Sequence, residues 1–426
     1  MLTYQPNQLQ LPNELLAIVV SHLSAHDLTQ LSRTCKSLNK FTESRLWTTL
    51  EFHHPSYHQH CDKKQPLPLI SSSDRFYPWG SSPQGPWRVG KLLQILHNLD
   101  THRLKTVCAR VKSICTVLQE SLSFWEFLPC FVNLESLELH ADHREAVEDR
   151  SFDASAPLLS KLRFARLVGY VPVPVVEWVL ASGKTIERLE LELLKEGMPC
   201  GSCIEDVLEN HPEDIDSPLR EDRQGNADGW SCIPRPLSGF LPDKHQLALP
   251  NLRYLYMCQP SDNDLDNEME ENYFWSTHAE VAAHKDWGRV LKSCSATLET
   301  LVVEQRMGME DCDLEGDRQH EFIKGDHQGL RSKRLMDLLG EVLAQQEFPA
   351  LRHVLLKGIT VSAGTPGGEF MELLRGLDIR CEARLGDCYM FDMGDGTACI
   401  CDWDNYDEGD DNLAGEEILA TVQSSS

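Results

Sequence analysis

Apolar and polar positions near the N-terminus repeat with the period of amphipathic helices. Within residues 11–23 the apolar side chains recur at helical intervals, which places them on one face; they are Leu11, Leu15, Ile18, Val19 and Leu23. Pro12 fits there because a proline in the first turn lacks only an amide hydrogen that the helix would leave unbonded. We therefore predict a helix over this stretch.

Two further short helices are predicted to follow. Asp27, with Gln30 three residues later, has the pattern of a capping box and marks the start of the second helix. The apolar residues on one side of that helix are Leu28, Leu31 and Cys35. Those of a third helix are Leu38, Phe41, Leu46 and Trp47.

Three helices of this length can bury little surface among themselves, so a domain this small is only marginally stable alone. The stretch has more large apolar side chains than its own core can hide, and the excess needs a covering surface. Two such surfaces are possible at this point: a partner protein, or the rest of the same chain.

The order of residues across 11–47 resembles an F-box. The matching positions are Leu11-Pro12-x-Glu14-Leu15, Leu23, Asp27-Leu28, Leu31, Cys35-Lys36, Leu38 and Leu46-Trp47. F-box domains bind the Skp adaptor of SCF-type cullin–RING ubiquitin ligases, so the resemblance implies this adaptor, and a cullin through it, as partners. It implies an adaptor-binding or motif-forming role for eight positions: Leu11, Pro12, Leu15, Ile18, Leu23, Leu28, Leu31 and Trp47.

A second pattern, Leu-x-x-Leu-x-Leu, recurs through the rest of the chain. Its copies begin at Val111, Leu134, Leu159, Ile186, Leu252, Leu298 and Leu351. The first spacings are 23, 25 and 27 residues, and the later ones are 66, 46 and 53. A period in the twenties with this pattern resembles leucine-rich repeats, in which each copy is a short strand and the segment after it returns as a helix or turn. The leucines are then structural, because each repeat is stabilised by its neighbours.

The segments between these copies are of two kinds. Four have helical spacing and are the expected return helices: 122–131, 173–181, 278–294 and 330–345. Three are rich in acidic residues, Gly, Pro and Ser, and they account for the longer spacings as insertions: 195–248, 260–277 and 306–329. Such insertions either form a binding face or are plain loops.

These patterns predict an α/β protein, with a small N-terminal three-helix F-box followed by an irregular leucine-rich-repeat solenoid that has a parallel sheet. Residues 1–50 are the F-box and 51–100 a proline-rich linker with a first helix. Residues 101–380 are the repeat domain. In the last region, 381–426, we expect 381–391 and 397–403 to pair as a capping hairpin before an acidic tail.

The net charge and the cysteine content limit which binding partners and which cellular compartment we expect. A net charge of −26 disfavours nucleic acid and anionic membranes as ligands, and it favours a protein partner with a basic surface. The same acidity is also compatible with a role in solubility alone. No apolar run reaches the ~20 residues that cross a bilayer, and no secretory signal is visible at the N-terminus. Fifteen irregularly spaced cysteines then indicate reduced thiols in the cytoplasm or nucleus.

No pattern in the chain predicts catalysis or a cofactor. One cluster has metal-ligand chemistry without zinc spacing: His53, His54, His58, His60 and Cys61. A second is a lone CxxC with two distant candidates: Cys200, Cys203, His211 and Cys232. The run from Asp311 begins like a calcium loop, but Phe322 stands where the loop needs glutamate. Nucleophile-elbow, phosphate-loop and dinucleotide motifs are absent from the sequence, so we expect no metal site and no enzyme activity.

The resemblance implies the substrate-recognition subunit of an SCF-type cullin–RING E3 ubiquitin ligase. The F-box would bind the Skp adaptor and the repeat domain a protein substrate. Such a chain acts by raising the effective concentration of the substrate near a recruited enzyme. A Skp-bound scaffold with no role in ubiquitination has the same sequence features and is the alternative.

Overall fold

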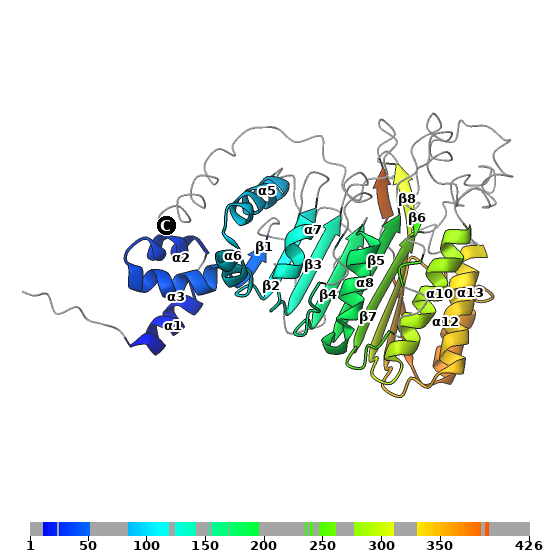
Figure 1. Ribbon diagram of the computed structural model, residues 1–426. Helices are drawn as coiled ribbons and strands as arrows, with labels where there is room; N and C mark the ends of the chain where they lie inside the picture. The colour runs from blue at the N-terminus through cyan, green and yellow to red at the C-terminus, as the bar shows by residue number, and fades with distance from the viewer. Residues whose placement is uncertain are drawn as a thin grey trace, which may run out of the picture.

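The computed structural model describes the following residues: 12–23, 25–51, 84–118, 124–141, 152, 156–169, 171–195, 235–236, 239–241, 247–260, 277–310, 330–384 and 388–391. They form a small group of helices at the N-terminal end and a long sheet with helices packed beside it (Figure 1). The protein is therefore a mixed helix and strand structure with a parallel sheet and N-terminal helices, as predicted.

The N-terminal group consists of α1 (Asn13–Ser21), α2 (Ala25–Ser32) and α3 (Lys36–Leu46). Pro12 is the N-cap of α1. Helix α2 begins two residues before the predicted start. Asp27 therefore lies in the first turn instead of at the N-cap, where its negative charge is still favourable beside the helix dipole.

The sheet follows the order of the sequence. Its main path consists of β1 (Thr49–Glu51), β2 (Ser113–Leu118), β3 (Ser136–Ala141), β4 (Phe164–Gly169), β5 (Arg188–Lys195), β7 (Tyr254–Pro260), β8 (Thr300–Glu310), β9 (His353–Lys357) and β10 (Arg380–Arg384). Neighbouring strands along this path are parallel in every case. Strand β1 follows α3 almost directly, so the sheet begins at the end of the helical group.

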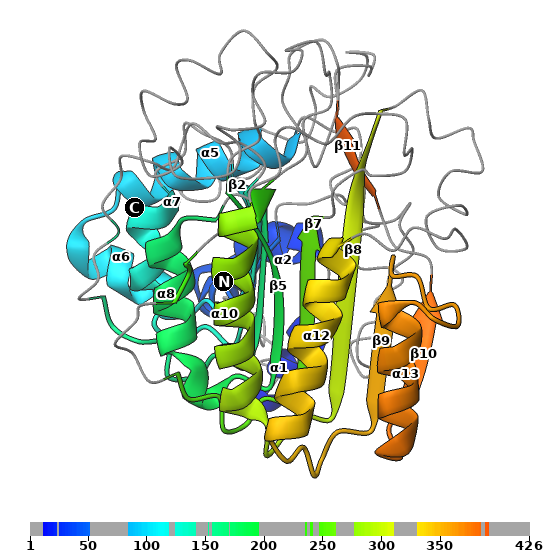
Figure 2. The ribbon, with the colours of Figure 1, turned by 90° about the vertical axis from the view of Figure 1, so that its right-hand side faces the viewer.

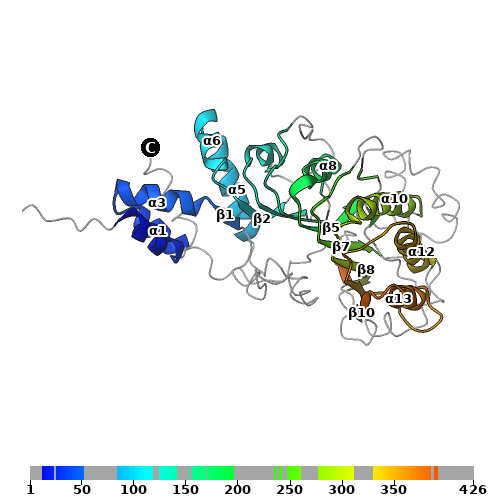
Figure 3. The same cartoon turned by 90° about the horizontal axis from the view of Figure 1, so that it is seen from below.

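Helices return between the strands. They are α5 (Gln84–His97), α6 (Thr101–Cys108), α7 (Phe124–Phe127), η1 (Leu128–Cys130), α8 (Val173–Ala181), η2 (Gly183–Thr185), α10 (Thr277–Cys294), α12 (Leu330–Gln345) and α13 (Pro366–Gly376). Helices α8, α10, α12 and α13 lie on one face of the sheet (Figures 2 and 3). Of the four predicted return helices, α8 and α12 have the predicted bounds, α10 begins one residue earlier, and 122–131 divides into α7 and η1.

Helix α13 had no prediction because its first turn contains Gly367 and Gly368, which are unfavourable in a helix, although Pro366 suits the first helical position. The Oγ1 atom of Thr365 caps it by accepting a hydrogen bond from the Gly368 amide at 3.1 Å. A Cβ atom at Gly367 would lie 2.3 Å from the Thr360 carbonyl oxygen, so only glycine permits this close approach.

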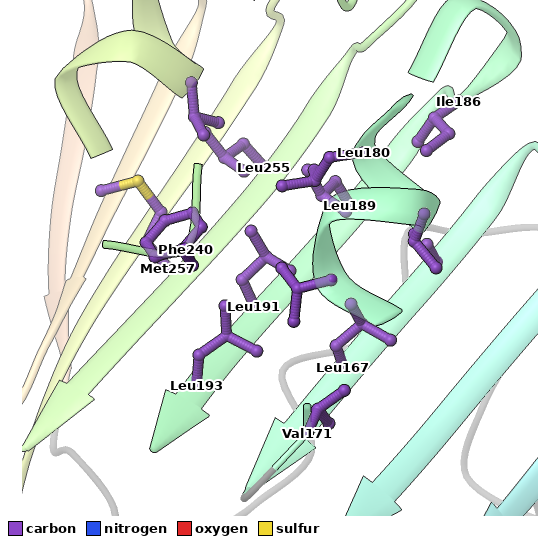
Figure 4. Packing of buried hydrophobic residues seen from close by; sticks show 14 of the residues in the cluster. Leu167, Val171, Leu180, Ile186, Leu189, Leu191, Leu193, Phe240, Leu255 and Met257 are labelled. Carbon is purple, nitrogen blue, oxygen red and sulfur yellow. The ribbon is translucent and has the colours of Figure 1, made fainter. Parts of the chain in front are cut away.

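The main core lies between the sheet and these helices. Apolar residues of successive strands align in two rows. The first row is Ile114, Leu137, Ala165, Leu189, Leu255, Leu301 and Val354, and the second includes Leu139, Leu167, Leu191, Met257, Val303 and Leu356. Figure 4 shows Leu189 of β5 beside Leu180 of α8, with Leu191 and Leu193 further along the same strand. Each buried leucine contributes roughly 1.5–3 kcal/mol, so the rows hold the sheet and the helices together.

One of the repeated patterns aligns differently from the prediction, whereas the last copy, with Val354 and Leu356, aligns as predicted. Leu137 pairs with Ala165, so the copy on β4 begins at Leu162 instead of Leu159. Alanine in a leucine position hid the correct alignment. At the last copy, Val354 and Leu356 belong to the main core. Leu355 lies in a smaller cluster on the opposite face with Tyr254, Tyr256, Cys258 and Val302.

The C-terminal strands differ from the expected hairpin. Strand β10 continues the parallel path beside β9. Strand β11 (Cys388–Phe391) pairs in parallel with Met307–Glu310 at the end of β8. The other half of the expected hairpin, 397–403, lies outside the described residues, as does the acidic tail. The sequence 380–384 carries no leucine, so it gave no repeat signal.

The predicted insertions lie mostly outside the described residues. Within the first, β6 (Arg235–Pro236) pairs antiparallel with β5, and Phe240 contacts Trp287 of α10 with ring centroids 5.2 Å apart. The Leu241 amide donates to Asp286 Oδ2 at 2.9 Å. The end of this insertion is thus fixed to α10. Strand β8 runs to Glu310 and so extends into the third predicted insertion.

Charges alternate in sign along the edge of the sheet where the strands begin. The residues are Lys112, Glu135, Arg163, Glu187, Arg253, Glu299 and Arg352, and each after the first donates its amide to the carbonyl of the one before. Ion pairs join Lys112 to Glu135 at 2.8 Å and Arg163 to Glu187 at 2.7 Å. Because these side chains are largely exposed, each pair contributes at most about 1 kcal/mol.

Reversing one charge in this series tests its contribution. Glu187→Arg places a third positive charge between Arg163 and Arg253, so we expect the free energy of unfolding to fall by about 1 kcal/mol, with a smaller loss at high salt. Urea denaturation at two salt concentrations measures this. Glu126→Arg, an exposed position on α7 outside the series, is the control and should change little; equal losses in the two variants would contradict the assignment.

Candidate functional site

Helix α1 exposes three large apolar side chains on neighbouring positions. The exposed fractions are 47 % for Leu15, 56 % for Ile18 and 48 % for Val19. Residues three and four apart share a helix face, so Leu15 forms a continuous patch with the other two. Val20 points the other way and is buried. We call Leu15, Ile18 and Val19 the α1 patch.

Other exposed large apolar residues in the described part of the chain are more scattered: Val132, Leu158, Val281, Leu373 on α13 and Leu377 at the C-cap of that helix. Single exposed apolar side chains are normal on a protein surface. Three on two turns of one short helix are unusual and mark a contact surface. The α1 patch is therefore the best-supported site in the described residues.

The eight positions predicted from the sequence to bind the adaptor or form the motif differ in how far their side chains are exposed. Pro12, Leu15 and Ile18 are exposed, whereas Leu23 and Leu31 are half-buried. Leu28 is 4 % exposed, so its side chain packs inside its own molecule. Trp47 packs against the main core, and Leu11 lies outside the described residues. Val19 was absent from the predicted set, although its place directly after Ile18 in the apolar pattern was a usable signal.

The helical group is joined to the sheet by several contacts. Glu43 of α3 forms an ion pair with Arg110, which follows α6, at 2.7 Å between Oε1 and NH1. The Thr48 carbonyl accepts hydrogen bonds from the Lys112 and Ser113 amides at 2.8 and 3.1 Å. Trp47 adds apolar contact with the core. These contacts fix α3 to the first strands of the sheet.

The sheet face opposite the helices carries a network of buried charges. Leu137 and Leu139 face the helices, so Glu138 between them points to the opposite face. Its Oε1 lies 2.8 Å from NH1 of Arg166, whose Nε is 3.4 Å from Glu190 Oε2. Arg188 also pairs with Glu190 and stacks over the Tyr254 ring at 4.0 Å. Pairing of this kind is what buried charges require.

The same face continues the network toward the C-terminal strands. Tyr256 Oη donates to Glu304 Oε2 at 2.6 Å, and Lys357 Nζ lies 2.9 Å from the same oxygen. Charged and aromatic side chains thus extend along this face from β3 to β9. These groups are buried, and they satisfy one another's charges and hydrogen bonds inside the protein.

A separate polar cluster is buried beside α10. His284 Nε2 lies 3.1 Å from Gln259 Oε1 and 4.0 Å from Glu280 Oε1. Arg334 holds the other Glu280 oxygen at 3.0 Å. Burial, and then the positive charge of Arg334, lower the pKa of His284 to about 4. The imidazole is therefore neutral in the folded protein near pH 7.

This burial predicts a dependence of stability on pH. An unfolded histidine has a pKa near 6.5, so below that value the unfolded chain takes up a proton that folded His284 resists. The free energy of unfolding should fall by roughly 3 kcal/mol between about pH 6.5 and pH 4 through this residue. His284→Gln should flatten the profile in chemical denaturation, whereas His22→Gln, at an exposed position, should leave it unchanged. An unaltered profile in His284→Gln would contradict the assignment.

The two metal-ligand clusters considered in the sequence, and the run from Asp311, lie outside the described residues. Among the residues that the structure does describe, no group of three or more His, Cys, Asp and Glu side chains could hold a metal ion. Within the same residues, no helix has the length and apolar character that crossing a membrane requires.

The structure thus defines a protein with a helical N-terminal module, which exposes an apolar patch, fixed to a parallel sheet. Comparison with family models identifies that module: residues 8–53 match the F-box-like family. The match covers all three helices and β1, and it ends before the rest of the sheet. A comparison of the chain with curated proteins gives no match. An F-box-like domain suggests binding to a Skp-type adaptor in SCF-type complexes, and such domains are typically non-catalytic adaptor modules.

Proposed function

We propose that this chain is the substrate-recognition subunit of an SCF-type cullin–RING E3 ubiquitin ligase. The F-box-like helices bind a Skp-type adaptor, which brings a cullin, and the remainder of the chain binds a protein substrate. The observation that carries the proposal is the exposed α1 patch inside the stretch that matches the F-box-like family. Exposure of a large apolar patch of this kind to water is energetically unfavourable. An adaptor surface packed over the patch would remove that exposure.

The predicted adaptor-binding positions contribute in different ways under this proposal. Pro12, Leu15 and Ile18 are accessible and contact the adaptor directly, together with Val19. Leu28 and Trp47 act indirectly, because Leu28 packs among the helices and Trp47 against the sheet. Leu11, Leu23 and Leu31 complete the set that the F-box resemblance implies.

The domain that presents the substrate is, in this proposal, an irregular leucine-rich-repeat solenoid running from 101 to beyond 380. Its support is the register of the apolar rows, together with the return helices on one face. We place the substrate on this repeat domain, as the resemblance to leucine-rich repeats implies. The charged and aromatic residues from Glu138 to Lys357, on the sheet face opposite the helices, are buried and pair with one another. A location in the cytoplasm or nucleus, where ubiquitin ligases work, belongs to the same proposal.

Substitutions in the α1 patch test adaptor binding. Leu15→Asp combined with Ile18→Asp removes two exposed apolar contacts, so we expect the Kd for a purified Skp-type adaptor to rise about 100-fold. The measurement is calorimetric titration of the full chain. Val281→Asp, which changes a 55 % exposed apolar residue on α10, is the matched control and should bind like the unmodified chain.

Unchanged adaptor affinity in the double variant, with circular dichroism showing an intact fold, would contradict the proposal. Leu28→Asp is unsuitable as a test because a buried charge would disrupt the helices themselves. Truncation before residue 51 is equally unsuitable, since it removes β1 from the sheet.

The alternative function is a Skp-bound scaffold that presents no substrate for ubiquitination. It has the same α1 patch, so the adaptor measurement does not distinguish the two. Two measurements in cells, made with the unmodified chain and with the double variant, do distinguish them: the partners that co-purify with each chain, and the half-lives of the clients. A ligase subunit loses both adaptor and cullin in the double variant, retains its clients, and those clients become longer-lived; a scaffold leaves client half-lives unchanged.

A further inference from the structure

Two cysteine thiols meet where the helical group joins the sheet. Cys108 is the last residue of α6 and Cys130 the last of η1. Both are free thiols, and they share a hydrogen bond. Asn133 Nδ2 donates to the Ala109 carbonyl at 2.6 Å, which holds the segment after η1 against the end of α6. The segments that follow the two cysteines are thus held together by the fold.

The two thiols have different environments. Cys108 is completely buried, whereas Cys130 is half-buried and can be reached from solvent. The hydrogen bond from Cys108 lowers the pKa of Cys130 to about 7, with a smaller contribution from the charge of Lys105 and opposition from burial. The thiolate is the reactive form of cysteine. Cys130 is thus suited to attack an oxidant, and Cys108 to react with the product.

We propose that Cys108 and Cys130 are a redox-sensitive dithiol that closes to a disulfide in the presence of a low-molecular-weight disulfide such as oxidised glutathione. The Cys130 thiolate attacks one sulfur of the oxidant, the S–S bond breaks, and one glutathione thiolate leaves. Cys108 then gives its proton to the departing glutathione thiolate, and its sulfur attacks Cys130 in the mixed disulfide and displaces the second glutathione. Two protein thiols are oxidised, and one glutathione disulfide is reduced to two thiols.

The position of this pair gives the disulfide a structural consequence. Arg110, two residues after Cys108, forms the ion pair with Glu43 of α3. A covalent bond between α6 and η1 would therefore restrain the segment that holds the F-box-like helices against the sheet. The inference goes beyond the proposed function and does not depend on adaptor binding.

Peptide mapping of the full chain tests the pairing. The protein is equilibrated in glutathione buffers of increasing oxidised fraction, quenched with acid, alkylated with a maleimide in denaturant near neutral pH, and digested with trypsin. Cys108 lies in peptide 106–110, and Cys115 and Cys130 lie together in 113–144. A second digestion with chymotrypsin, after Phe127 and Phe131, separates Cys115 from Cys130. We expect a 108–130 linkage to form while Cys294 stays reduced, because burial raises the pKa of Cys294 to about 12.

Two variants assign the roles of the thiols. Cys108→Ser should lose the linkage and retain glutathione on Cys130, whereas Cys130→Ser should leave Cys108 reduced. The proposal is overturned if no 108–130 linkage appears at any ratio that leaves Cys294 reduced, if Cys108 links to Cys115 instead, or if Cys108 oxidises at an unchanged rate in Cys130→Ser. The mapping of the unmodified chain decides the pairing even if a variant fails to fold.

Discussion

The stacking of apolar rows between the sheet and its helices is the constraint on which the rest of this protein depends. Leu137, Leu189, Leu255 and Leu301 occupy equivalent positions on parallel strands, and each is fully buried. No single strand with its helix could bury these side chains alone. The sheet therefore forms as an extended unit, which supports the F-box-like helices at one end and a network of buried, paired charges on the face opposite its helices.

Much of the fold could be predicted because its signals are local and periodic. The helices at 173–181 and 330–345 follow directly from apolar spacing, and most strands follow from the recurring leucines. The prediction failed where this signal was weak or absent. Ala165 replaces a leucine and shifted one copy of the repeat, while β10 carries arginines and a glutamate where leucines would have marked a strand. Helix α13 depends on a tight approach at Gly367 that only tertiary structure reveals.

The candidate site was predictable in position but not in detail. The order of residues from 11 to 47 located the F-box-like module, which the family match at 8–53 supports. Sequence alone could not say which side chains remain exposed, since that depends on how the helices pack on one another and on the sheet. Leu28 is buried and Val19 is exposed, although each lies on the apolar face predicted for its own helix. The buried pairs on the sheet face opposite the helices, such as Arg166 with Glu138, were not predicted because their partners are far apart in sequence.

Hydrogen–deuterium exchange of the full chain, with and without a purified Skp-type adaptor, tests the central claim most directly. The account requires that the apolar rows of the sheet are buried by helices of the same chain, whereas the α1 patch is buried only when a partner binds. It predicts that amides of β3, β5 and β8 exchange slowly under both conditions, and that α1 gains protection only when the adaptor is present. Protection of α1 that is already complete without the adaptor, or that does not change on its addition, would contradict the account.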